Sequence, residues 1–399
     1  MIPNITTKDI HTAHTPPAYL QTKNHYEILD GLRGVVAILV VAFHIFNSFG
    51  DHFHQLINHG YLAVDFFFVL SGFVVAYAYD DRWSKMTQWD FYKRRFIRLQ
   101  PMAIMGTIIG AALFYAQECR AFPLIGITPV WKMLLVMLVG FAMLPLTTSM
   151  DIRGWRQMLP LNGVAWSLFY EYIANILYAL VIRRFSTTLL AVFVFLAASF
   201  LVQFLLLGPL GDVDGGFSFQ KFHVHIGFAR LLYPFFAGVL LVRIRKLIYL
   251  RSAFAICSLL LCVILSIPRI GGAEHLWMNG LYESVCIVIL FPLIVAIGAG
   301  SRITGKNSIK ICKFLGEISY PLYITHYPIY CVYLAWVLNN NVPMAKGLLV
   351  GLAVLVLCIA VAYASLKFYD EPVRKWLTNR FLKSPRPLSP VVKAPGQPI

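Results

Sequence analysis

Charged side chains are scarce in this chain of 399 residues. They make up 13% of the sequence and hydrophobic residues make up 59%, against about 25% and 45–50% in a typical soluble domain. Acidic residues are the rarest, with 18 Asp and Glu against 34 Lys and Arg and a formal net charge of +16. A water-soluble fold is therefore excluded. We expect no nucleic-acid partner, because Lys and Arg of a membrane protein accumulate in its cytoplasmic loops.

Paired cysteines and an N-terminal apolar run are also missing. The seven cysteines form no C-x-x-C pair, so neither a disulfide framework nor a zinc site is indicated. Residues 1–28 are polar, and we expect no cleaved signal peptide there. The sequence predicts three parts: a polar cytoplasmic segment at 1–28, a transmembrane domain at 29–376, and a basic, proline-rich cytoplasmic tail at 377–399.

Apolar stretches of about the length of a membrane helix, roughly 17–25 residues, are abundant. The sequence holds eleven of them, at 34–49, 60–79, 99–116, 131–146, 166–182, 188–207, 225–242, 253–267, 281–299, 318–337 and 344–368. All eight tryptophans fall between these stretches or at their ends, where amphipathic rings meet the lipid headgroups. The predicted fold is an all-α, polytopic integral membrane helical bundle.

The basic connections predict the topology. Those at 82–98, 183–184, 243–251, 302–313 and 374–380 are expected to be cytoplasmic, whereas the first connection holds no Lys or Arg and is expected outside. Three stretches lie between the first two basic connections, and an odd number of crossings cannot return the chain to one side. We expect the short stretch 131–146 to be re-entrant, because 16 residues cover only about 24 Å. The sequence therefore predicts about ten transmembrane helices, with both termini cytoplasmic.

Ionisable residues inside apolar stretches are rare and mark functional sites. Arg33 and His44 are eleven residues apart, about three helical turns, so they are expected on one face about 16 Å apart. We expect Arg33 at the cytoplasmic mouth, where it binds anionic groups, and His44 near the middle of the span. An imidazole is suited to general base catalysis. The alternative is that Arg33 anchors the helix and His44 only packs.

Two further groups of charged residues stand out. Arg94 and Arg95 precede Arg98 by one turn, so the three form a clamp for phosphate groups or an ordinary topological anchor. Glu171 is an intramembrane carboxylate one turn after Ser167. It is expected to orient a catalytic histidine, to activate a hydroxyl, or to form a structural pair with the buried Arg230.

Four features are given smaller roles. Asp65, Ser71 and Gly72 are expected to serve helix packing. His326 lies between Pro321 and Pro328 in a helix that we expect to be interrupted and to line a cavity. The histidine pairs at 52–54 and 223–225 are read as solvated loops, and no metal site is predicted.

The chain resembles, over about residues 26–376, the membrane-bound acyltransferase-3 family, whose members transfer acyl groups to hydroxyls of the bacterial envelope. The resemblance rests on six segments in family order: Arg33 and His44 as an Arg-x10-His motif, 64–73, Arg95-x2-Arg98-x2-Pro101, 166–171, 318–328 and 371–375. It implies that His44 is the catalytic residue, that Arg33, Arg95 and Arg98 hold the phosphates of cytoplasmic acyl-CoA, and that Glu171 supports the reaction. The chain departs from the family pattern at Pro321, where a small or polar residue is expected, and this leaves the role of His326 open.

Three functions are weighed. The first is an integral-membrane O-acyltransferase of the bacterial inner membrane. It would move an acyl group, expected to be acetyl, from acyl-CoA to a hydroxyl of an envelope glycan, exopolysaccharide or glycolipid. Acyl-CoA is then a substrate and no permanently bound cofactor is expected. The expected partners are the glycan or lipid-linked sugar acceptor, membrane lipids and polysaccharide synthesis or export proteins. The second is a transporter that uses Arg33, His44, Glu171 and Arg230 as a proton or anion pathway, and the third is an envelope scaffold.

Overall fold

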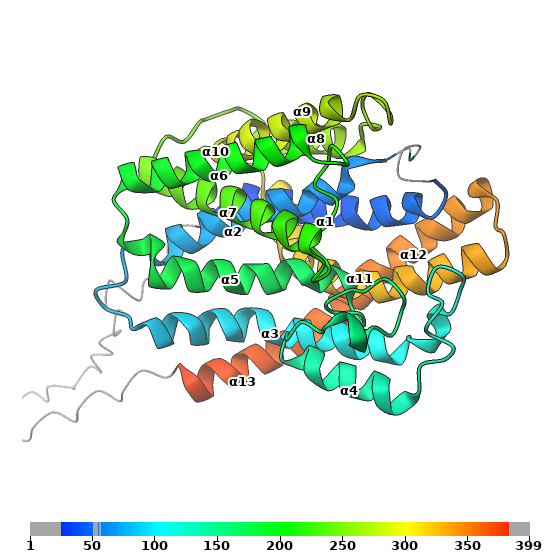
Figure 1. Ribbon diagram of the computed structural model, residues 1–399. Coiled ribbons are helices and arrows are strands. Elements are labelled where there is room, and N and C mark those ends of the chain that lie inside the picture. Colours follow the sequence, from blue (N-terminus) through cyan, green and yellow to red (C-terminus); the bar gives the residue numbers. More distant parts are fainter. Residues whose placement is uncertain (1–24, 51–54, 56, 383–399) are drawn as a thin grey trace, which may run out of the picture.

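The computed structural model describes residues 25–50, 55 and 57–382. Its named elements are all helices, and an isolated bridge between Gln157 and Ser218 is the only strand-like pairing among these residues. The helices run roughly parallel to one another across the view of Figure 1. The expected pair 52–54 and most of the segments 1–28 and 377–399 lie outside the described residues. The predicted all-α, polytopic membrane bundle is confirmed.

Eleven helical segments of the described chain match the eleven predicted stretches. Seven are long and apolar enough to cross a membrane. They contain α1 (Glu27–Asn47), α2 (Ala63–Tyr79), α5 (Trp166–Leu180), α6 (Thr187–Leu207), α7 (Lys221–Ile244), α9 with α10 (Leu276–Val285 and Phe291–Gly300), and α12 with α13 (Met344–Ser365 and Glu371–Phe381). Two are more polar, α3 (Gln88–Ala112) and α11 (Lys306–Asn339), and two are short, α4 (Val130–Phe141) and α8 (Ala253–Ser266).

Two helix pairs are continuous through a π-helical turn. One turn, Cys286–Leu290, joins α9 to α10, and the other, Leu366–Asp370, joins α12 to α13. A π-helical turn holds an extra residue and is frequent at functional sites. The helix that follows each turn therefore presents other side chains to the rest of the bundle than an unbroken α-helix would.

Two helices begin well before their apolar stretches, which the prediction missed. α3 begins at residue 88 instead of 99, and α11 begins at 306 instead of 318. At α3 the cause is a capping box in which Thr87 and Asp90 each accept from the other's backbone N–H. Hydrogen bonds from Thr87 and Lys93 lower the pKa of the Asp90 carboxyl, which lies before the apolar part of α3. The capped, water-facing turn extends the helix beyond its apolar part.

Contacts at one end of the bundle, here called the basic end, join the ends of α2, α5 and α7. Arg243 Nε lies 2.8 Å from Asp80 Oδ2, and Arg243 Nη1 donates to the Phe185 carbonyl at 2.7 Å. Tyr178 donates to Asp80 Oδ1 at 2.6 Å. α3 begins near the basic end and α5 ends there. The chain therefore leaves the basic end along α3 and returns to it along α5. Between them α4, with 12 residues, is about 18 Å long, shorter than the predicted stretch 131–146.

Close helix contacts around α1 and α2 depend on glycine. α1 packs along α11, and α2 packs along α7. A Cβ atom on Gly34 would lie 2.4 Å from the Leu315 carbonyl oxygen, and one on Gly72 would lie 1.8 Å from the Phe235 carbonyl oxygen. The predicted packing role is thus confirmed for Gly72, because only glycine permits these approaches.

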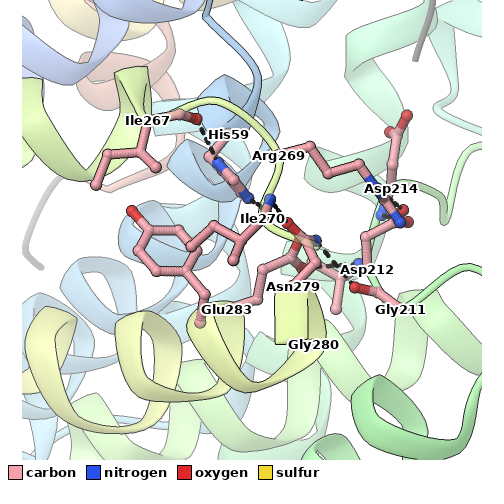
Figure 2. A network of polar contacts seen from close by, with 12 residues as sticks. His59, Gly211, Asp212, Asp214, Ile267, Arg269, Ile270, Asn279, Gly280 and Glu283 are labelled. Carbon is pink, nitrogen blue, oxygen red and sulfur yellow. Dashed lines mark hydrogen bonds and ion pairs between the residues drawn. The ribbon is translucent and has the colours of Figure 1, made fainter. Parts of the chain in front are cut away.

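A buried polar network ties three loops together at the other end of the bundle, where α2, α7 and α9 begin (Figure 2). The ring nitrogens of His59 lie 2.7 Å from the Ile267 carbonyl oxygen and 3.0 Å from Asn279 Oδ1. Arg269 Nη1 lies 2.6 Å from Asp212 Oδ2, and Asn279 donates to Glu283 Oε1 at 2.8 Å. These side chains are fully buried or nearly so. Paired polar groups therefore fix this end of the bundle.

Candidate active site

A cavity of about 680 Å³ holds most of the predicted site. Arg33 of α1, Arg95 and Arg98 of α3, and Glu171 of α5 all line it. It reaches from the first residues of α1 at the basic end to Ser167 and Tyr323 between α5 and α11. Residues of three helices that are far apart in the sequence thus line one cavity.

Arg33 is held against α11. Its Nε donates to Ser319 Oγ at 2.7 Å, and its Nη2 donates to the Gly316 carbonyl at 3.0 Å. Asp30 Oδ1 lies 3.1 Å from the same Nη2. These bonds leave Nη1 without a partner among the described residues, so one side of the guanidinium is available to a ligand in the cavity.

Arg95 and Glu171 form an ion pair inside the cavity. Arg95 Nη2 lies 2.5 Å from Glu171 Oε1, and Ser71 donates to the same oxygen at 2.7 Å. The Arg95 side chain is 6% exposed, and its Nε has no hydrogen-bond partner among the described residues. The expected packing role of Ser71 is wrong in part, because its hydroxyl binds this carboxylate. Glu171 therefore holds a guanidinium and a hydroxyl in place.

The alternative pairing of Glu171 with Arg230 is wrong. Arg230 is paired with Asp65, whose Oδ2 lies 2.7 Å from Arg230 Nη2, and both side chains are fully buried. Its remaining donors bind the Val213, Gly215 and Tyr61 carbonyls. Asp65 is therefore the counter-ion of Arg230, a role that the prediction of simple packing missed. A relay from Glu171 through Arg230 is not supported, because Arg230 is saturated by other groups.

Arg98 is a cation of the cavity wall whose guanidinium has no protein partner in the described chain. It is exposed to the cavity and makes no hydrogen bond or ion pair with the residues that the structure describes. Arg94, on the same side of the helix by spacing, is exposed and does not line the cavity. Of the three arginines of the predicted clamp, Arg95 and Arg98 line the cavity and Arg94 does not.

His44 lies apart from the cavity. It belongs to the last turn of α1 and is not among the lining residues. Its ring centroid lies 5.3 Å from that of His326, 4.9 Å from that of Tyr330 and 5.4 Å from that of Tyr327. Arg33 and His44 both contact α11, as the shared face predicts. Within α1 the ring lies near the end and not at the centre, because the helix runs from Glu27 to Asn47.

His326 lies between the cavity and His44. The helix continues through Pro321 and Pro328, so the expected interruption is wrong. The ring is fully buried, and its centroid lies 6.1 Å from that of the cavity residue Tyr323. Nδ1 lies 3.0 Å from the Leu322 carbonyl oxygen, which only accepts, so Nδ1 carries the proton. Nε2 is then an acceptor, and it is buried without a partner among the described residues.

The sequence prediction missed two other polar features of the cavity wall. Ser167 Oγ and Tyr323 Oη lie 2.8 Å apart at its inner end. Asp370 and Arg374, which follow α12, line the cavity near its basic end. The segment 371–375 had already been singled out in the resemblance, but no role was attached to it.

Comparisons with known proteins identify the family of the chain. Residues 26–366 match the family model described as an acyltransferase domain, acyltransferase-3. O-acetyltransferase OatA of Staphylococcus aureus (strain NCTC 8325 / PS 47) is 25% identical over 374 residues, which are 87% of this chain and 57% of that protein. YrhL of Bacillus subtilis (strain 168), whose name marks it as a candidate peptidoglycan O-acetyltransferase, is 28% identical over 89% of this chain and 56% of its own length.

A third relative is Protein 2 in the picA locus of Rhizobium radiobacter. It is 34% identical over 163 residues, which are 38% of this chain and 80% of that protein. The chain spans a little over half the length of the two O-acetyltransferases that it matches. No solved structure matches the chain significantly.

Proposed function

Since the chain belongs to the acyltransferase-3 family, we propose that it is an integral-membrane O-acyltransferase. It moves an acyl group, in our proposal acetyl, from cytoplasmic acyl-CoA to a hydroxyl of an envelope glycan, exopolysaccharide or glycolipid. The observation that carries this proposal is the cavity in which Arg33, Arg95 and Arg98 converge at the basic end. The names of the O-acetyltransferase relatives agree with an acetyl donor and a sugar acceptor.

The three arginines bind the phosphates of the donor. Guanidinium groups suit this task because they present several N–H donors in a fixed plane. Arg98 is free of protein partners, while Arg33 and Arg95 each keep one nitrogen without a partner. Glu171 acts as a positioning residue, because its carboxylate fixes Arg95 at 2.5 Å.

His44 acts as the general base. It removes the proton of the acceptor hydroxyl, the hydroxyl oxygen attacks the thioester carbonyl, the new C–O bond forms and the C–S bond breaks. The sulfur leaves as a thiolate and takes up the proton from the imidazolium, so protons and charge balance. The cavity ends at Tyr323, and His326 separates it from His44. The thioester therefore reaches His44 only when the side chains of Tyr323 and His326 move aside.

The proposed site of action is the bacterial inner membrane, with both termini cytoplasmic. The support is the gathering of Arg183, Arg243 and the cavity arginines at the basic end, because basic residues stay on the cytoplasmic side. The acceptor then approaches from the end that holds the buried polar network.

The test uses purified protein in lipid nanodiscs with acetyl-CoA as the probe. We expect saturable binding and slow release of CoA thiol, as water replaces the missing acceptor. An empty nanodisc is the control for hydrolysis in solution. Absence of acetyl-CoA binding would overturn the proposal, whereas binding of free acetate or inorganic phosphate alone would point to an anion carrier.

A further inference from the structure

Asp370 is a buried carboxylate with one unused oxygen in the cavity wall. It is the last residue of the π-helical turn Leu366–Asp370, and it is 2% exposed. Its Oδ2 lies 2.9 Å from Arg374 Nη2, one turn further along. Its Oδ1 is buried and has no hydrogen-bond partner among the residues that the structure describes. Both residues line the cavity, so a ligand there lies next to this carboxylate.

Arg374 also has a buried polar atom without a hydrogen-bond partner. Its Nη2 binds Asp370, but its Nε is buried without a partner in the described chain. In an ordinary surface ion pair between residues four apart, the carboxylate and the guanidinium bind each other and their remaining polar atoms are hydrated. Here the remaining acceptor and donor are both buried, and such groups are costly to leave unpaired. A ligand with one donor and one acceptor would satisfy both.

The other cavity groups restrict the chemistry of that ligand. Arg98, free of protein partners, and Arg33, with Nη1 available, favour an anion. The free oxygen of Asp370 favours an N–H or O–H donor next to it, because a carboxylate oxygen accepts hydrogen bonds and repels a phosphate oxygen. A nucleotide meets both needs, since its phosphates accept while its sugar hydroxyls and the adenine amino group donate.

We propose that Asp370 and Arg374 form the nucleoside subsite of the donor. Asp370 Oδ1 accepts from a ribose hydroxyl or the adenine amino group of acyl-CoA, and Arg374 Nε donates to an adjoining phosphate oxygen. The proposal rests on the proposed function, because it takes acyl-CoA as the donor. The proposal adds α13 to the binding site. It also assigns a role to the π-helical turn, which orients Asp370 toward the cavity.

The central variant is Asp370→Asn. Arg374 only donates, so the asparagine oxygen must face Arg374 and its NH₂ then replaces Oδ1. The subsite would present a donor where an acceptor is needed. We expect the Kd for acetyl-CoA to rise about tenfold or more, while use of S-acetylpantetheine, which lacks the nucleotide, stays unchanged. Arg374→Met is expected to give the same pattern.

Three other measurements make the outcome decisive. Asp80→Asn removes a carboxylate paired with Arg243 at the same end of the bundle but outside the cavity, and it should leave acetyl-CoA binding unchanged. 3′-Dephospho-acetyl-CoA tests the phosphate contribution, and an inosine analogue of acetyl-CoA tests the contribution of the adenine amino group. An Asp370→Asn protein with wild-type Tm and wild-type Kd for acetyl-CoA would overturn the subsite, as would equal weakening of both donors. Failure of the wild-type protein to bind acetyl-CoA would overturn the proposed function together with it.

Discussion

The ring of His326 lies 5.3 Å from the ring of His44, centroid to centroid, and its Nε2 is a buried acceptor without a partner among the described residues. The two imidazoles come from helices that pack along each other, α1 and α11. This relationship places a second base next to the proposed catalytic base, on the side that faces the cavity.

Replacing His326 by glutamine should lower kcat by about 10²-fold, the smaller part of the range for acid–base groups. The reason is that His326 presents a basic Nε2, unpaired among the described residues, next to His44, and a glutamine side chain is polar but cannot accept a proton at that position. The KM for acetyl-CoA should stay within twofold, because His326 does not line the donor cavity. Steady-state kinetics over a range of donor concentrations measures both values. A kcat within twofold of wild type in a protein of unchanged Tm would assign His326 to packing alone.

Replacing Arg98 by alanine should raise the KM for acetyl-CoA about tenfold or more, as expected for the loss of a charge-assisted hydrogen bond. The KM for the acceptor should not change, because the arginine contacts only the donor. Arg94→Ala is the matched control, because Arg94 lies one turn away in the same basic run and outside the cavity. Equal effects of the two substitutions would favour general anchoring over a phosphate contact.

Replacing Asp65 by alanine should destabilise the bundle by about 3–5 kcal/mol, because it leaves the buried Arg230 cation without its counter-ion. Chemical unfolding in detergent measures the free-energy change. Lys93→Ala removes the cation from the exposed pair with Asp90 but leaves the capping box intact, and it should change stability by less than about 1 kcal/mol. Similar losses in the two variants would contradict a structural role for the Asp65–Arg230 pair.

Replacing Gly72 by valine should prevent α2 and α7 from packing. Even a Cβ atom there would lie 1.8 Å from the Phe235 carbonyl oxygen, so the two backbones must separate. Gly305→Ala is the control, because a Cβ atom at that position meets nothing nearer than 3.4 Å. Size-exclusion chromatography and Tm distinguish the two proteins. A well-folded, active Gly72→Val protein would show that the helices do not approach so closely.

The helices could be predicted from the sequence because apolar runs of membrane length are a direct physical signal. The ion-pair partners of the buried charges could not be predicted from the sequence. Glu171 and Arg230 are both buried charges of opposite sign, yet they bind Arg95 and Asp65 instead. These pairs join residues 76 and 165 positions apart, and only the packing order of the helices decides between them.

The role of the C-terminal residues was missed for a different reason. The π-helical turn before α13 holds an extra residue, so a count at 3.6 residues per turn loses its phase there. Asp370 therefore could not be placed in the cavity from spacing. In contrast, Arg33 and His44 lie on an unbroken helix, and their common contact with α11 follows from the count.

The most direct test of the account is the single-turnover rate of acetyl transfer from acetyl-CoA in His44→Ala. His225→Ala, which removes an exposed imidazole, serves as the matched control. We expect His44→Ala to bind acetyl-CoA with the wild-type Kd, because His44 does not line the donor cavity, and to release CoA no faster than an empty nanodisc. Transfer at the wild-type rate in a folded His44→Ala protein would contradict the assignment of His44 as the catalytic base.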